Sequence, residues 1–335
     1  MIDGNILRTA SDTLKKYASW VIFTHKKADG DAAGSASALF QTGINSGRLV
    51  SWYSPDINLP EAYSFLPDYS KHTYTDKYSF DDINSLYVFL DCANEARSVD
   101  GFDPSKNINA LNIDHHEDNT LFGRVNCVDG SASSACEVLY QVLKSGGWEI
   151  TADIARSLYV GMFTDTGGFN FSNTSPLTHR IAAELIEYGA EPDRLADLIT
   201  QNKTPGGLNV WAKALSRVKT FGDNGIFALS WLYTDDFISA CADKTETEGL
   251  PSMLMGLRGV KLIAMLTEGV NGDVRCSFRS RYGSPFGAGE IARLFGGGGH
   301  ERASGATLKG SVRECAEQIE ALILQKYHEC SSVGE

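Results

Sequence analysis

The stretch "WVIFTHKKADGD", residues 20–31, decides the fold class because it joins an apolar run to a polar turn that contains glycine. The apolar run at 20–25 predicts a buried strand, and the small residues at 32–44 predict a helix packed closely on a sheet. A strand followed by such a helix indicates a mostly parallel α/β sheet, whose ligands bind beyond the carboxyl ends of its strands. His25, Asp29 and Asp31 lie at such an end, so this turn is a candidate binding site.

The same alternation of strands and helices continues along the N-terminal half. Further strands are predicted at 48–53, 85–91 and 110–114, and further helices at 131–145, 151–163 and 176–189. The polar stretch 202–209 predicts a linker. Beyond it, strands are predicted at 225–232, 260–268, 273–281 and 305–310, and a helix at 311–327. The predicted fold class is α/β: a domain at 1–195 with a mostly parallel sheet flanked by helices, a linker region at 196–220, and a smaller α+β C-terminal domain at 221–330.

Length and composition narrow the class of protein. A chain of 335 residues with 42% hydrophobic and 21% charged residues predicts a globular protein of two domains. A net charge of −12 argues against a protein that coats long duplex nucleic acid. The sequence has no apolar run of the roughly 20 residues that span a bilayer, and no secretory signal at its start. Its seven scattered cysteines contain no C-x-x-C pair, which predicts reduced thiols and a cytoplasmic location.

Acidic and histidine residues follow several predicted elements at one edge of the sheet. The segment 85–91 ends in Asp91, and the segment 110–114 leads into adjacent histidines. Each residue alone has an ordinary explanation, such as a helix N-cap for Asp29 or Asp31 or a turn for Asp91. Together they predict a bound cation, because like charges that converge on one edge repel unless a cation neutralises them. The candidate metal-binding residues are His25, Asp29, Asp31, Asp91, Asp114, His115, His116 and Asp165.

The kind of donor predicts which ions bind. Carboxylates and imidazoles without thiolates suit Mn²⁺ or Mg²⁺. The donors are too many for one tetrahedral zinc ion, and their number suits two ions that share a carboxylate. Two such ions form the usual clamp for in-line displacement at phosphorus, with a bridging water that becomes a hydroxide nucleophile. The sequence therefore predicts that these carboxylates hold metal ions.

Six motifs, in order along nearly the whole chain, resemble the DHH phosphoesterase family, which is RecJ-like. Four of them lie in the first domain: "HKKADGD" (25–31), "FLDCAN" (89–94), "NIDHHEDN" (112–119) and "FTDTGGF" (163–169). "SFRSR" (277–281) and "GGGGHERASGA" (296–306) resemble the DHH-associated C-terminal domain. Ala28 stands where the family usually has proline, which removes a rigid turn residue but no ligand. The resemblance is closest to the nanoRNase and pAp phosphatase group.

The resemblance implies a role for each motif residue. His25, Asp29 and Asp91 would bind one ion, and Asp31, Asp91, His115 and Asp165 the other, with Asp91 bridging. Mn²⁺ is the expected ion, with Mg²⁺ or Co²⁺ as alternatives. His116 would face the substrate phosphate as a hydrogen-bond donor or general acid. Asp114 would orient a histidine, or would only cap the end of its strand.

Further residues are candidates for binding the substrate. The backbone N–H groups of Gly297, Gly298 and Gly299, together with His300, would bind a phosphate or ribose, although such a glycine run also suits a flexible turn. Arg279 would contact a phosphate or stack on a base. Ser134 would donate to a phosphate, or equally would cap the helix at 131–145.

The resemblance implies hydrolysis of short oligoribonucleotides to mononucleotides, and of 3′-phosphoadenosine 5′-phosphate (pAp) to AMP. The expected partner is therefore short single-stranded RNA or a nucleotide, with no membrane and no long duplex, and a homodimer is left open. Two alternatives remain. One is a phosphodiesterase for cyclic-di-AMP or a linear dinucleotide, which would use the same residues. The other is a catalytically silent nucleotide-binding regulator, which would have lost a metal ligand.

Overall fold

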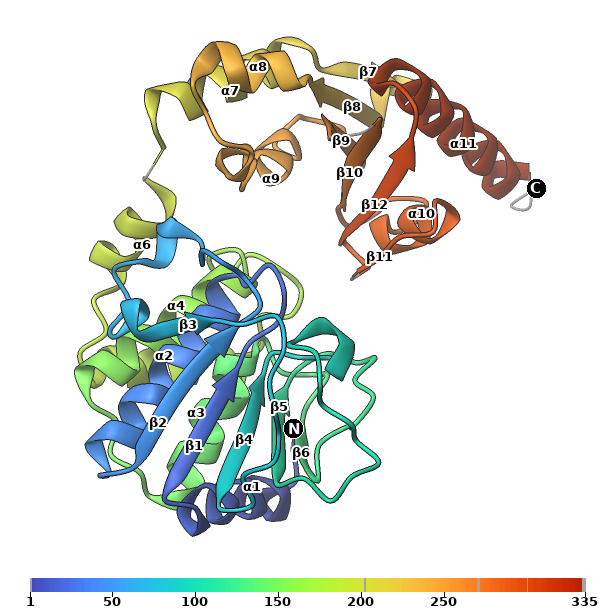
Figure 1. Cartoon of the computed structure of the whole chain (residues 1–335). Helices are drawn as coiled ribbons and strands as arrows, with labels where there is room; N and C mark the ends of the chain where they lie inside the picture. Colours follow the sequence, from blue (N-terminus) through green and yellow to red (C-terminus); the bar gives the residue numbers. More distant parts are fainter. Residues whose placement is uncertain (1, 202, 270–271, 300, 333–335) are drawn as a thin grey trace. The chain divides into compact units, whose positions relative to one another are not determined.

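The computed structural model describes residues 2–201, 203–269, 272–299 and 301–332. The chain divides into two compact units, of which the first ends at residue 202 and the second begins at Lys203 (Figure 1). Each unit contains its own hydrophobic cores. The described part of the chain contains no helix that is long and apolar enough to cross a membrane. All seven cysteines are free thiols.

The first unit is built on a parallel sheet of six strands in the order β3-β2-β1-β4-β5-β6. The strands are β1 (Ser19–Phe23), β2 (Leu49–Ser54), β3 (His72–Tyr74), β4 (Ser85–Leu90), β5 (Ala110–Asp114) and β6 (Val125–Val128). The order reverses between β1 and β4, which is where ligands bind in sheets of this kind. Phe23 of β1 pairs with Phe89 of β4. His25 and Asp91 therefore leave the sheet at the same level, each two residues beyond this pair.

The helices of the first unit share one hydrophobic core with one face of the sheet, represented by Trp20 and Ile22 of β1. These helices are α1 (Gly4–Lys16), α2 (Gly30–Asn45), α3 (Ala135–Gly146), α4 (Ala152–Asp165), α5 (Pro176–Glu187) and α6 (Pro192–Thr200). Phe23 and Phe89 point to the opposite face, where Phe80 and other aromatic residues from connecting segments cover them. Short 3₁₀ helices lie at Glu61–Tyr63, Tyr69–Lys71 and Glu95–Arg97.

Glycines allow α2 and α4 to pack closely beneath the loop that follows β1. A Cβ atom added to Gly34 would lie 2.5 Å from the carbonyl oxygen of Ser157. One added to Gly161 would lie 2.2 Å from Cys136 Sγ and 2.6 Å from Asp31 Oδ1. The prediction of a small-residue helix packed closely after the first strand is confirmed.

The second unit has a mixed six-stranded sheet in the order β11-β12-β10-β9-β8-β7, in which only β8 and β9 pair in parallel among the described residues. Its strands are β7 (Lys219–Phe221), β8 (Phe227–Leu232), β9 (Leu262–Glu268), β10 (Asp273–Ser280), β11 (Gly298–Gly299) and β12 (Ala303–Lys309). Helices α10 (Ala288–Leu294) and α11 (Val312–Ser332) cover one face. Helices α7 (Pro205–Ser216), α8 (Thr234–Ala240) and α9 (Leu250–Leu254) cover the other. Short 3₁₀ helices lie at Asp223–Gly225 and Lys244–Thr247.

The prediction of a linker at 202–209 is wrong for most of its length. Helix α7 begins at Pro205, and the side chain of Thr204 caps it by accepting a hydrogen bond from the N–H of Gly207. Proline at the first helical position and threonine before it are a normal helix start. The pair of glycines in "TPGGLN" suggested a loop, but both residues lie within the first turn of this helix.

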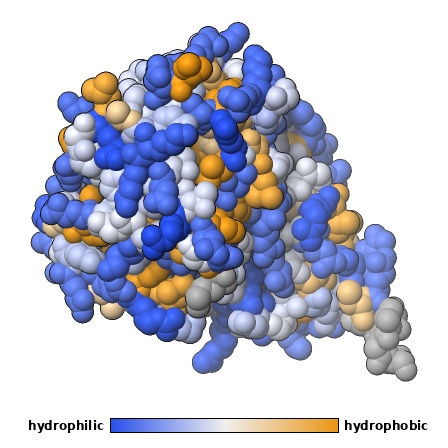
Figure 2. Space-filling view, turned by 90° about the horizontal axis from the view of Figure 1, so that it is seen from below, coloured by the Kyte–Doolittle hydropathy of each residue, from blue (hydrophilic) through white to orange (hydrophobic). Residues whose placement is uncertain are grey.

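On the face of the protein in Figure 2, apolar residues form small groups among hydrophilic ones. Exposed apolar side chains include Ile83, which is 79% exposed, and Leu49, which is 76% exposed. Scattered apolar side chains of this kind are normal on a surface that faces water. The candidate binding site instead lies at the loops that follow the carboxyl ends of β1, β4 and β5.

Candidate metal centre

Asp29, in the loop after β1, caps a helix and also faces the imidazole of His25. It is the N-cap of α2, because its Oδ1 accepts hydrogen bonds from the N–H groups of Asp31 and Ala32 at 3.0 and 3.1 Å. The same oxygen lies 3.9 Å from His25 Nε2. The helix-cap explanation is thus confirmed for Asp29. It does not compete with metal binding, because a carboxylate has lone pairs to spare after two hydrogen bonds.

The N-terminus of α3 holds the carboxylate of Asp31. The N–H of Ala135 donates to Oδ2 at 2.6 Å, and the N–H of Cys136 donates to Oδ1 at 2.9 Å. Asp31 is buried, and this burial together with the negative charge of Asp91 raises its pKa to about 7. A carboxyl group with such a pKa lies in a site with too much negative charge, which a cation would relieve.

Asp91 lies at the centre of the cluster and follows β4 directly, in a left-handed backbone conformation with φ of 55°. Its Oδ2 lies 3.2 Å from His25 Nε2. Its Oδ1 lies 3.5 Å from both His115 Nε2 and His116 Nδ1, and it has no hydrogen-bond partner among the described residues. A buried carboxylate oxygen without a partner is costly, since it has lost its water and gained no hydrogen bond. A metal ion bound to this oxygen would remove the cost.

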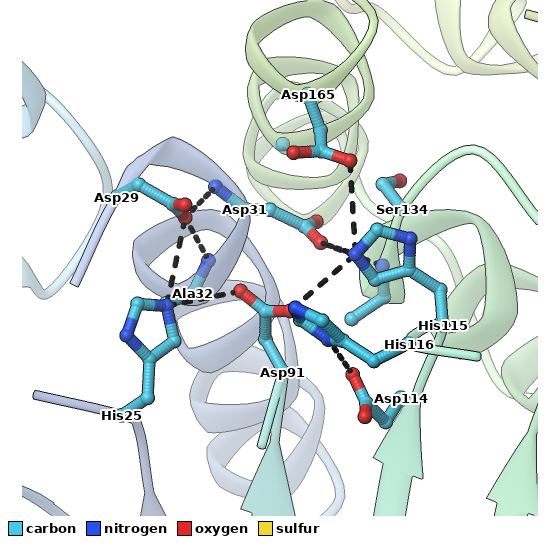
Figure 3. A network of polar contacts seen from close by, with 12 residues as sticks. His25, Asp29, Asp31, Ala32, Asp91, Asp114, His115, His116, Ser134 and Asp165 are labelled. Atoms are coloured by element: carbon cyan, nitrogen blue, oxygen red, sulfur yellow. Dashed lines mark hydrogen bonds and ion pairs between the residues drawn. The ribbon is translucent and has the colours of Figure 1, made fainter. Parts of the chain in front are cut away.

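The two buried histidines face this carboxylate from opposite sides (Figure 3). His25 Nδ1 donates to the carbonyl oxygen of Lys26 at 2.8 Å, which leaves Nε2 for the cluster. Burial alone would lower the pKa of His25, but hydrogen bonds to Asp29 and Asp91 outweigh it and raise the pKa to about 11. The pKa of His115 is likewise raised, because the bond to Asp91 outweighs burial. Both imidazoles hold protons at positions where a metal ion would supply the positive charge instead.

Three groups of side chains in the described structure could each hold an ion, because the donor atoms within each group lie within 4.8 Å of one another. The first group is His25, Asp29 and Asp91, the second is Asp31, His115 and Asp165, and the third, which shares Asp91 with the first and His115 with the second, is Asp91, Asp114, His115 and His116. Asp165 Oδ2 lies 3.6 Å from His115 Nε2. Asp165 is the last residue of α4, so it reaches the site from a helix end and not from a strand. Donor type, burial and the unpartnered oxygen of Asp91 all fit a pair of divalent ions.

His116 and Asp114 form a separate pair beside these donors. Asp114 Oδ1 accepts a hydrogen bond from His116 Nδ1 at 2.8 Å, and its Oδ2 accepts one from Asn119 Nδ2 at 2.6 Å. Asp114 is fully buried. The carboxylate therefore fixes the ring of His116, as expected for a residue that orients a histidine, and the other ring nitrogen, Nε2, lies 3.4 Å from Arg97 Nη1.

Of the predicted substrate contacts in the glycine run, Gly298 and Gly299 form the short strand β11 and pair with β12. A Cβ atom on Gly297 would lie 2.1 Å from the carbonyl oxygen of Gly305, whereas Gly298 faces open space. The run is therefore a close approach between two chain segments and not a free turn. His300 lies outside the described residues.

Arg279 and Ser134, the other predicted contacts, have local partners. Arg279 is half-buried on β10, and its Nη1 donates to the carbonyl oxygen of Phe278, whereas its Nε has no partner among the described residues. Ser134 is buried and accepts a hydrogen bond from the N–H of Glu137 at 3.1 Å. Of the two explanations left open for Ser134, the helix cap is the one present in the structure.

Asp56 holds the loop after β1 that carries His25 and Asp29, and it was not predicted from the sequence. It lies just after β2, and its carboxylate accepts hydrogen bonds from the N–H groups of Lys27 and Ala28 at 3.0 and 2.9 Å. Lys27 has a left-handed conformation with φ of 61°. Proline at position 28 would have no N–H to donate. Asp56 thus stiffens the loop at the position where the family's usual proline is absent.

Replacing Asp56 with alanine should weaken Mn²⁺ binding by roughly 10–100-fold, as is typical when a residue that supports metal ligands is removed. The physical reason is that two loop N–H groups lose their acceptor, so His25 and Asp29 are held less firmly. Isothermal titration with Mn²⁺ would measure the change. Asp103→Ala is the matched control, because Asp103 also accepts a loop N–H, from Ser105 at 3.0 Å, but belongs to none of the donor groups. Equal Mn²⁺ affinities for the two variants would refute this role of Asp56.

The chain matches two domain-family models and is similar to several known proteins. The sequence model of the DHH family, N-terminal domain, matches residues 19–162, and that of the DHHA1 domain matches residues 233–330. A protein of Thermus thermophilus named bifunctional oligoribonuclease and PAP phosphatase NrnA is 32% identical over 309 residues, covering 91% of this chain and 89% of the relative. A protein of Bacillus subtilis with the same name is 28% identical over 304 residues, covering 88% and 91%.

Solved structures agree on the fold. An exopolyphosphatase-related protein of Bacteroides fragilis superposes with a TM-score of 0.89 at 23% identity, over 100% of this chain and 99% of the other. RecJ of Thermus thermophilus in complex with Mn²⁺ superposes with a TM-score of 0.56 at 13% identity, over 97% of this chain and 55% of the other. Together with the domain matches and the Thermus relative, these findings show that the chain belongs to the DHH phosphoesterase family and carries a DHHA1 domain after its DHH domain.

Proposed function

We propose that this protein is a metal-dependent phosphoesterase that hydrolyses short oligoribonucleotides to mononucleotides and pAp to AMP. The observation that carries the proposal concerns Asp91: its Oδ1 is buried without a hydrogen-bond partner among the described residues, and the residue belongs both to the group with His25 and to a group with His115. The substrates are supported by the names of the Thermus and Bacillus relatives, which cover about nine-tenths of the chain. The free cysteines fit the reducing cytoplasm as the place of action.

Two divalent ions, Mn²⁺ in preference to Mg²⁺ or Co²⁺, would supply the positive charge that polarises a phosphoryl oxygen and acidifies water. We propose His25, Asp29 and Asp91 as ligands of one ion, and Asp31, Asp91, His115 and Asp165 as ligands of the other. The left-handed backbone at Asp91 aims its carboxylate at both groups and is retained at some cost in strain.

His116 is proposed as the residue that faces the leaving group. In hydrolysis a water oxygen bonds to phosphorus, the bond from phosphorus to the leaving oxygen breaks, and that oxygen takes up a proton. Nδ1 of His116 donates to Asp114, so Nε2, which lies 3.4 Å from Arg97 Nη1, is the ring nitrogen proposed to act as hydrogen-bond donor or general acid when it is protonated. In the second unit, Arg279 and the glycine run at 296–299 are proposed to bind a phosphate or ribose of the substrate.

Removing the metal should abolish activity. The purified protein would be dialysed against EDTA and assayed before and after Mn²⁺ is restored. The substrates would be RNA of two to five nucleotides, pAp, cyclic-di-AMP, its linear product and pyrophosphate. We expect the fastest turnover on short RNA, slower release of phosphate from pAp, and no turnover until Mn²⁺ returns. Full activity in EDTA would contradict a metal-dependent reaction.

The same panel distinguishes the alternative substrate. A phosphodiesterase for cyclic-di-AMP or a linear dinucleotide would use the same residues of the first unit. Faster cleavage of cyclic-di-AMP than of any short RNA would overturn the substrate assignment and leave the metal centre in place. Binding of nucleotides without turnover of any substrate would favour the silent regulator.

A further inference from the structure

Arg97 directs its side chain towards the candidate metal centre. It is the last residue of the 3₁₀ helix Glu95–Arg97, six residues beyond Asp91. Its carbonyl oxygen accepts a hydrogen bond from the N–H of Lys26 at 2.6 Å, which ties it to the loop after β1. Its Nη1 lies 3.4 Å from Nε2 of His116. The guanidinium and the ring nitrogen proposed to face the leaving group therefore meet at one point.

Arg97 has no carboxylate partner in the described part of the chain. The side chain is half-buried beside a cluster of aspartates, yet no carboxylate lies within 4.0 Å of its nitrogens in the described part of the chain. By contrast, Arg217 makes two hydrogen bonds to the carboxylate of Asp236. A guanidinium has five N–H donors in a fork that matches two oxygens of one carboxylate or phosphate. Most of the donors of Arg97 are thus free for an anion.

The charge of the metal centre indicates which anion this is. Four aspartates are proposed as ligands, and their charge of −4 is balanced by two divalent ions at +4, so the loaded centre is neutral. A phosphodiester or phosphomonoester then brings negative charge that no ligand balances. Arg97 is a cation that already contacts His116, so it can balance this charge where the substrate binds.

We propose that Arg97 is a substrate-binding residue that donates to a non-bridging oxygen of the phosphate attacked at the metal centre. The inference deepens the proposed function and rests on it. Arg97 Nη1 and His116 Nε2, at 3.4 Å from each other, are close enough to bind two oxygens of one phosphate group. The loop anchor uses the backbone of Arg97, so substitution of the side chain leaves that anchor in place.

Arg97→Ala and Arg97→Lys test the proposal, with Arg124→Ala as the matched control. Arg124 is exposed, and its Nη1 contacts the side chain of Asn109 in the same unit. On the substrate that the unmodified protein turns over fastest, we expect kcat/KM of Arg97→Ala to fall by roughly 10–100-fold. Arg97→Lys should lie in between, since it keeps the charge and loses the fork. Guanidinium chloride at millimolar concentration should restore part of the activity of Arg97→Ala and none of that of Asp91→Asn.

Two binding measurements separate this role from a structural one and from failure of the proposed function. Titration with Mn²⁺ should give equal affinities for Arg97→Ala, Arg124→Ala and the unmodified protein. Titration of the Mn²⁺-loaded proteins with AMP should show weaker binding for Arg97→Ala alone. This second measurement applies even if none of the tested esters is hydrolysed. The proposal is overturned if AMP binds equally to all three proteins, or if Mn²⁺ affinity falls together with AMP affinity.

Discussion

Replacing Asp91 with asparagine should reduce phosphoester hydrolysis by roughly 10³-fold or more, which corresponds to about 4 kcal/mol of lost transition-state stabilisation. Asp91 is the only described residue that belongs both to the group with His25 and to a group with His115. The amide keeps the shape of the side chain but lacks the negative charge that two cations would share. Both ions should therefore bind more weakly, and not only one of them.

Asparagine is the informative substitution at this position because of the backbone. Asp91 has φ of 55°, a conformation that asparagine tolerates and that alanine adopts at a cost of roughly 1 kcal/mol or more. Circular dichroism and the melting temperature should therefore stay close to those of the unmodified protein, while Mn²⁺ titration shows the loss of binding. Asp118→Asn, an exposed aspartate in the same stretch as His115, is the control and should keep full activity. Near-native turnover by Asp91→Asn would refute a shared carboxylate.

Replacing Gly161 with alanine should damage both the fold and the metal centre. The new methyl group would lie 2.2 Å from Cys136 Sγ and 2.6 Å from Asp31 Oδ1, and neither neighbour can withdraw because both are buried. Overpacking of this kind costs about 1–3 kcal/mol of unfolding free energy. We also expect Mn²⁺ affinity to fall by roughly 10-fold or more, since Asp31 must shift away from its backbone donors on α3.

Two further variants separate the two clashes at Gly161. Gly4→Ala is the control for the glycine-to-alanine change itself, because nothing lies within 4 Å of the added atom and stability should change by less than about 0.5 kcal/mol. The double variant Cys136→Ala with Gly161→Ala removes the contact with sulfur but keeps the contact with Asp31. It should recover part of the melting temperature and none of the Mn²⁺ affinity. Unchanged Mn²⁺ binding in Gly161→Ala would show that Asp31 tolerates the displacement.

The sequence predicted the parallel sheet and the donors at its edge because both depend on local patterns. Apolar runs mark the strands: His25 and Asp91 lie just beyond the ends of β1 and β4, and Asp114 is the last residue of β5. In a parallel sheet these positions meet at one edge, whatever the details of the loops. Asp165 was predicted to lie at the same edge, although it is the last residue of helix α4. A sequence motif identifies the residue but does not show whether a strand or a helix carries it.

The residues that support the site could not be predicted in the same way. Asp56 accepts from two N–H groups that lie 29 and 28 residues away in the chain, and Arg97 contacts a histidine 19 residues away. Neither belongs to a spacing that local chemistry requires, so only the folded chain brings them to the loop. Two helices that were not predicted could have been recognised from the residues at their starts. Thr204 followed by Pro205 is a readable helix start, and helix α1 begins with Asp3 as a regular N-cap.

The proposed ligands are spread along most of the first unit, so they cannot be moved to another protein as one short segment. A calcium-binding loop of the EF-hand type carries its ligands within roughly twelve consecutive residues, so it can be moved between proteins as a short segment. Here the proposed ligands extend from His25 to Asp165, and neighbouring donors in space come from the ends of β1, β4 and β5, from the start of α2 and from the end of α4. Any segment that contained all of them would include every strand of the parallel sheet except β1, which ends two residues before His25. The proposed centre would therefore have to be inherited or engineered together with its sheet.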